Sequence, residues 1–241
     1  MTRFLIGILI FIGADLFAQE KQNFNDGRDS FSIYASSKGN DLMAFEAYAG
    51  IKGTPFLVDT WSIGSIVLKN GDVFDNLRLK YDMNEDNVLV WDKTDKKIFP
   101  SRNITKSFNF TDSTGVSHFF INISEKEYKF EIGIDFGFFE LLYNGKTKLL
   151  AKRKKYLHHV EPKGGYSDNK SYDEFRSESP KYYWVDNKGK LFELKKGKKN
   201  ILNLLKDDGS LEAYIKKEKI KLNKEQDIVQ LIQHYDTEYL K

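Results

Sequence analysis

Hydrophobic and polar residues alternate with a period of two along much of this chain, most clearly between Glu127 and Phe138. Six large apolar residues fall on one parity: Tyr128, Phe130, Ile132, Ile134, Phe136 and Phe138. Because successive strand residues point to opposite faces, this pattern predicts one strand with a single apolar face. Asn144-Gly145 follows and favours a two-residue type I′ turn, so we expect an antiparallel hairpin with a return strand from Lys148 to Tyr156.

Shorter apolar runs separated by turn residues lie on both sides of this hairpin. They predict strands at Ser65–Lys69, Val73–Tyr81, Val88–Trp91, Arg102–Phe110 and Ser117–Ile123, and a last hairpin from Lys181–Val185 and Lys190–Leu194. Short strands at regular spacing indicate an antiparallel meander, arranged as an open sheet, a sandwich or a partly closed barrel. We assign residues 61–195 to this β domain.

Beyond residue 195 the apolar period changes to that of a helix. Asn200–Lys206 forms a first helical pattern, Ser210 is positioned to cap a second, and Asn223 with Gln226 has the layout of a capping box for a third. The third pattern carries an apolar stripe at Ile228, Ile232, Tyr235 and Tyr239. The prediction is therefore an α+β fold, mostly antiparallel β, with C-terminal helices at 196–241 packed on the β domain.

The first 19 residues have the layout of a secretory signal peptide. Arg3 precedes an apolar run from Phe4 to Ala14, which is too short to span a bilayer, and Leu16-Phe17-Ala18-Gln19 is typical of a cleavage region. We therefore expect an exported protein, periplasmic or extracellular, with no transmembrane segment in the mature chain. Residues 20–60 are rich in polar residues and predict a flexible or irregular N-terminal segment.

Composition limits the chemistry that is available. The chain has no Cys, which excludes disulfides and thiolate metal sites, and it has only four His. Asp82-x-Asn84-x-Asp86 begins like a calcium loop, but Lys93 stands where a bidentate Glu is required. No nucleophile motif or glycine-rich phosphate loop is present, so we assign no catalytic residue, metal or cofactor. A hydrolase with an unrecognised site stays open as an alternative.

The positive charge gathers between residues 146 and 206, which hold 17 Lys and Arg against seven Asp and Glu, a net charge of +10. The candidate ligand-binding residues lie at the start of this region: Lys152, Arg153, Lys154, Lys155, Tyr156 and His158. Basic residues interleaved with aromatic ones suit acidic polysaccharides or lipid headgroups, and export makes nucleic acid the less expected target. The alternative, which we favour, is that these lysines protect an edge strand from pairing with other chains.

Four segments resemble uncharacterised exported β-rich proteins of Bacteroidota-type bacteria. They are Phe17-Ala18-Gln19, residues 52–71 with Lys52-Gly53-Thr54-Pro55 and Gly64-Ser65-Ile66, the Leu141–Lys146 hairpin, and the helical segment from Ile228 to Tyr239. The resemblance implies an envelope or secreted location and a β-rich domain, and it carries over no site residue. We therefore expect a non-enzymatic interaction or structural module of the cell envelope. Its expected partner is an envelope protein or an acidic polysaccharide or lipid surface. The sequence leaves the oligomeric state open.

Overall fold

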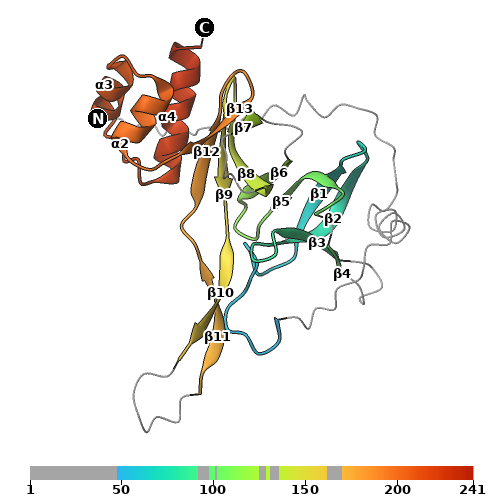
Figure 1. Ribbon diagram of the computed structural model, residues 1–241. Helices are drawn as coiled ribbons and strands as arrows, with labels where there is room; N and C mark the ends of the chain where they lie inside the picture. Colours follow the sequence, from blue (N-terminus) through green and yellow to red (C-terminus); the bar gives the residue numbers. More distant parts are fainter. Residues whose placement is uncertain are drawn as a thin grey trace, which may run out of the picture.

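The computed structural model describes residues 48–91, 98–100, 102–124, 129–130, 136–161 and 170–240. Within these residues one open sheet of eleven strands runs in the order β4-β3-β2-β1-β5-β6-β8-β9-β12-β13-β7, and a separate ribbon pairs β10 with β11. Every neighbouring pair is antiparallel except β13 with β7. The structure confirms the mostly antiparallel α+β fold, as a single sheet that does not close (Figure 1).

The strands are β1 (Ser62–Leu68), β2 (Val73–Asp82), β3 (Asn87–Trp91), β4 (Ile98–Pro100), β5 (Thr105–Thr111), β6 (Ser117–Ile123), β7 (Lys129–Phe130), β8 (Gly137–Asn144), β9 (Lys148–Lys152), β10 (Lys155–Val160), β11 (Tyr172–Ser177), β12 (Lys181–Val185) and β13 (Lys190–Leu194). The helices are α2 (Lys198–Leu205), α3 (Ser210–Lys217) and α4 (Glu225–Glu238). The predicted hairpins β1–β2 and β12–β13 both form.

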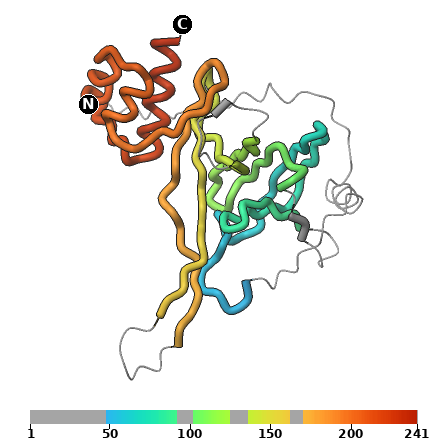
Figure 2. The backbone as a smooth tube through the Cα atoms, in the orientation of Figure 1, coloured from blue at the N-terminus to red at the C-terminus, as the bar shows by residue number. Residues whose placement is uncertain are grey.

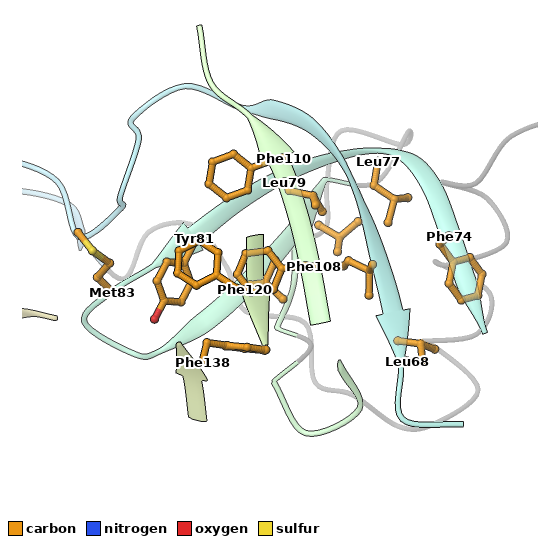
Figure 3. Close-up of a cluster of buried hydrophobic side chains, with 13 residues drawn as sticks. Leu68, Phe74, Leu77, Leu79, Tyr81, Met83, Phe108, Phe110, Phe120 and Phe138 are labelled. Atoms are coloured by element: carbon orange, nitrogen blue, oxygen red, sulfur yellow. The ribbon is translucent and has the colours of Figure 1, made fainter. Parts of the chain in front are cut away.

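Aromatic and aliphatic side chains of β1, β2, β3, β5 and β6 form a core in the first half of the sheet. Figure 3 shows Tyr81, Phe108 and Phe120 gathered at its centre. The ring centroids of Phe108 and Phe120 lie 4.8 Å apart, and those of Tyr81 and Phe120 lie 4.6 Å apart. Phe138 of β8 belongs to the same cluster, so apolar residues of β2 and β5 and Phe120 of β6 face one shared interior.

The three helices cover one face of the other half of the sheet, next to β9, β12 and β13 (Figure 1). Ile228 and Ile232 of α4 are fully buried there together with Trp184 of β12. The predicted stripe on α4 therefore packs against the sheet. Asp236 joins the helix to the β8–β9 turn, because its carboxylate accepts hydrogen bonds from the N–H (2.8 Å) and the hydroxyl (2.6 Å) of Thr147.

The ribbon of β10 and β11 continues from β9 and β12 but leaves the sheet. Figure 2 shows it extending away from the body, at the end opposite to the helices. At its base, the irregular segment at residues 48–60 crosses from the ribbon to β2. Lys52 pairs in parallel with Glu174 of β11, and Phe56 pairs with Asp82 of β2.

Two predictions about the central hairpin are wrong. Residues 127–138 do not form one strand, because Phe130 belongs to β7 beside β13 while Phe138 belongs to β8 between β6 and β9. The turn is not type I′ either, since neither Asn144 nor Gly145 has a positive φ. Asn144 still pairs with Lys148, and the loop between them holds three residues, which fits the anchoring of Thr147 by Asp236.

The predicted helix caps also differ from the observed ones. Ser210 is the first residue of α3, and the carboxylate of Asp207 accepts the N–H groups of Leu211 (2.8 Å) and Glu212 (3.1 Å). Helix α4 begins after Lys224 without a side-chain cap, so the capping box of Asn223 does not form. The helices themselves begin within about two residues of the predicted positions, which is the usual uncertainty of helix ends.

The predicted signal peptide at 1–19 and residues 20–47 lie outside the described residues. From residue 48 to residue 60 the structure shows no helix or strand beyond a single turn and two isolated bridges. This segment is held by backbone hydrogen bonds, from Leu57 N–H to the carbonyl of Tyr81 (3.0 Å) and from Met83 N–H to the carbonyl of Pro55 (2.9 Å).

Candidate functional site

The candidate basic run lies where the hairpin leaves the sheet. β9 ends at Lys152, Arg153 and Lys154 form the junction, and β10 begins at Lys155. The predicted return strand is therefore split into two strands that belong to different sheets. This split decides where each basic side chain points.

Lys152 points into the protein. Its side chain is 7% exposed, and its ammonium donates to Asp86 Oδ2 (2.8 Å) and to the carbonyls of Phe136 (3.2 Å) and Phe138 (3.0 Å). The other Asp86 oxygen accepts the hydroxyl of Tyr81 (2.7 Å). A Cβ at Gly137 would lie 1.8 Å from Asp86 Oδ2, so only glycine leaves room for this buried ion pair.

Arg153 connects the sheet to α4. Its guanidinium bonds Glu140 of β8 through Nε and bonds both carboxylate oxygens of Glu225 through Nη2, at 2.9 and 3.0 Å. The hydroxyl of Tyr182 donates to the same Glu225 carboxylate (3.0 Å). Because Glu225 is the first residue of α4, this network fixes the start of the helix to the junction between β9 and β10.

His118 extends the network toward the β5–β6 turn. Its Nδ1 lies 2.7 Å from Glu140 Oε1, and its Nε2 lies 3.4 Å from Asp112 Oδ2. Burial favours the neutral ring, but the hydrogen bonds and charges of Glu140 and Asp112 outweigh it and raise the pKa of His118. Burial likewise disfavours the charge on Glu140, yet His118 and Arg153 hold the pKa of that carboxyl below its usual value.

Lys155 is held by the segment that crosses the ribbon base. Its ammonium donates to the carbonyls of Thr54 (2.8 Å) and Phe56 (2.7 Å). Burial lowers the pKa of Lys155, and the charges of Asp59 and Asp82 oppose that effect. Lys152, Arg153 and Lys155 thus make contacts within the protein, and they do not form one surface.

The remaining candidates lie on or beside the ribbon. Lys154 is exposed at the junction, Tyr156 is 39% exposed, and His158 is half-buried. Tyr156 and His158 share one face of the ribbon, and their ring centroids are 6.3 Å apart. The structure therefore brings together Tyr156 and His158, and it separates them from Lys152 and Arg153.

Leu157 is the ribbon residue that the sequence analysis missed. It is 47% exposed and lies opposite Phe175 on the face that does not carry Tyr156. A signal was present, because Tyr156, Leu157 and Val160 place apolar residues on both parities of one short strand. A strand packed on one side only would not show that pattern.

The carboxylates of the turn between β2 and β3 also bond groups within the protein. Asp82 accepts the hydroxyl of Tyr48 (2.6 Å) and the N–H groups of Asn84 (2.9 Å) and Glu85 (3.0 Å), while Asp86 pairs with Lys152. In the part of the chain that the structure describes, no three His, Asp or Glu residues are arranged to hold a metal ion.

Comparison of the chain with protein families, curated proteins and solved structures found no match. Among the residues that the structure describes, no helix has the length and the apolar character needed to cross a membrane.

Proposed function

We propose that this protein is a non-enzymatic interaction module exported to the cell envelope, and that the β10–β11 ribbon is its contact element. The observation that carries the proposal is the ribbon itself, a two-stranded element that extends from the body (Figure 2). It exposes the side chains of Tyr156 and Leu157. A two-stranded hairpin is marginally stable alone in water. A partner that covered Tyr156 and Leu157 would remove apolar surface from water on both faces of the ribbon.

The contacts of two of the four histidines support a non-enzymatic role. Both ring nitrogens of His118 lie beside carboxylates, and those of His159 lie 2.7 Å from Asp173 and 3.2 Å from Glu161. Carboxylates beside both ring nitrogens stabilise the protonated ring, which is not the form that acts as a general base. The buried cluster of His118, Glu140 and Arg153 is therefore better explained as a support of the ribbon junction than as a catalytic group.

Photo-crosslinking in the source cell tests the contact role. A photoreactive phenylalanine analogue replaces Leu157 in one variant and Val116, which is 52% exposed on the β5–β6 turn, in the control. We expect a discrete cross-linked product from position 157 and none from position 116. Equal products from both positions, or none from either, would overturn the proposal.

Cell fractionation tests the export part of the proposal. The sequence pattern of residues 1–19 is its only support, so the expected result is a tagged protein found outside the cytoplasm and shortened at its N-terminus. A full-length protein retained in the cytoplasm would refute export and leave the contact role to be judged separately.

A second candidate function is binding to an acidic glycan or lipid surface through the basic region at 146–206. One observation favours it: Lys154 is exposed, and so are Lys195, Lys196 and Lys199 near the start of α2. Such binding should weaken steeply as salt rises. Sedimentation with anionic vesicles and acidic polysaccharides, with Lys→Gln changes at these four positions as the comparison, would detect or exclude it.

A further inference from the structure

The hydrogen bonds of the ribbon show which backbone groups point outward. On β10, the N–H of Lys155 points away from β11 and donates to the carbonyl of Met83 (3.2 Å). On β11, the carbonyl of Asp173 and the N–H of Phe175 point away from β10 and bond Lys52, both at 2.9 Å. Because these directions alternate along a strand, Leu157 and His159 of β10 also direct their N–H and C=O groups outward.

Within the described residues, that outer edge of β10 is unpaired beyond Lys155. No other strand among the described residues pairs with β10, and Leu157 on this edge is 47% exposed. Edge strands are usually protected by lysine, proline or a bulge at the outward positions. Here those positions carry Leu157 and His159, which leave the edge able to accept another strand.

The opposite edge of the ribbon is already occupied. Lys52 adds to β11 as a parallel bridge and takes the outward groups of Asp173 and Phe175. The ribbon therefore offers one open edge and one that the chain covers itself.

We infer that the open edge of β10 pairs antiparallel with β10 of a second copy about a twofold axis, in a four-stranded sheet ordered β11-β10-β10-β11. This inference rests on the proposed function and names the partner of the ribbon. Because the β11 edges are covered at residues 173–175, the pairing ends at two copies and does not continue into a fibre.

The available backbone groups fix the register. Placing Leu157 opposite His159 of the second copy uses both free outward residues of each strand. Placing Leu157 opposite Leu157 would require the N–H of Lys155, which Met83 already occupies. Placing His159 opposite His159 would require Glu161, which lies beyond the end of β10. The register that places Leu157 opposite His159 therefore uses the free backbone N–H and C=O groups of both residues.

The side chains are complementary in that register. Tyr156 lies opposite Val160 of the second copy, so apolar residues face one another. Residues 155–161 and 170–178 together carry three basic and four acidic side chains, so two ribbons approach without strong repulsion. His158 lies opposite His158 at the twofold axis.

Single-cysteine cross-linking tests the register directly, because the chain has no Cys of its own. His158 would be a non-hydrogen-bonded pair with its copy, where Cβ atoms lie about 4.5–5.5 Å apart and need only a small approach to form a disulfide. We expect H158C to form a disulfide-linked dimer under mild oxidation and V116C, with its exposed side chain, to stay monomeric. Equal cross-linking of the two variants would overturn the inference.

Sedimentation velocity of the purified protein provides the second measurement, from about 1 to about 100 µM. We expect a concentration-dependent dimer, with Leu157→Lys raising its dissociation constant by about tenfold or more and Val116→Lys leaving it unchanged. A protein that stays monomeric throughout refutes the inference. If the photo-crosslinker at 157 then captures a different protein, the proposed function stands; if it captures nothing, both fail.

Discussion

Replacing Asp86 by Asn removes the negative charge that pairs with the buried Lys152, and it exchanges one of the two acceptor oxygens for an NH2 donor. Asn has the shape of Asp, and it tolerates the positive φ of 52° that this residue adopts in the β2–β3 turn. The Lys152 ammonium, whose side chain is 7% exposed, would lose the carboxylate that lies 2.8 Å away. The measured loss therefore combines the cost of an unpaired buried charge with the loss of one acceptor for Tyr81 or Lys152.

The magnitude follows from what remains around the ammonium. Removing one partner of a buried ion pair costs about 3–5 kcal/mol of unfolding free energy. Lys152 keeps the carbonyls of Phe136 and Phe138 as acceptors, at 3.2 and 3.0 Å, so we expect the lower end, about 3 kcal/mol. For a chain of this size, that loss lowers Tm by about 6–12 °C.

Urea unfolding followed by fluorescence measures the free energy, with Lys154→Met as the control. Lys154 is the exposed neighbour, so its loss should change stability by less than about 0.5 kcal/mol. The double variant Asp86→Asn with Lys152→Met should regain stability relative to Asp86→Asn alone, because the unpaired charge is gone. A loss below about 1 kcal/mol for Asp86→Asn, or a double variant no better than the single one, would refute the reasoning.

Two further predictions concern His118 and Gly64. Folding raises the pKa of His118, so the protonated ring stabilises the folded protein below about pH 6.5. That contribution is lost as the pH rises through the pKa that His118 has in the folded protein. His118→Gln should therefore cost about 1–2 kcal/mol at low pH and little above it, and a cost that grows with pH would contradict this. A Cβ at Gly64 would lie 1.9 Å from the carbonyl of Asn109, so Gly64→Ala should cost about 1–3 kcal/mol in urea unfolding. Ser65→Ala removes only the exposed hydrogen bond from its hydroxyl to Asp75 (2.7 Å) and should cost less than Gly64→Ala, so equal losses would contradict the clash.

The sequence by itself determined the local elements. Alternation and turn residues located the hairpins β1–β2 and β12–β13, and the change to a helical period located α2, α3 and α4. These signals are local, because a strand shows its two faces within a few residues. The same reasoning failed at residues 127–138, where one alternating pattern is divided between strands at different places in the sheet.

The tertiary structure alone decided what the basic run does. Lys152 meets Asp86 from 66 residues away, and Arg153 meets Glu225 from 72 residues away. The pattern of charges along the chain contains no information about such distant partners, so it could not distinguish an inward lysine from an exposed one. The open edge of β10 also depends on the fold, because only the pairing of β11 and the bridge from Lys52 determine which backbone groups of Leu157 and His159 remain free.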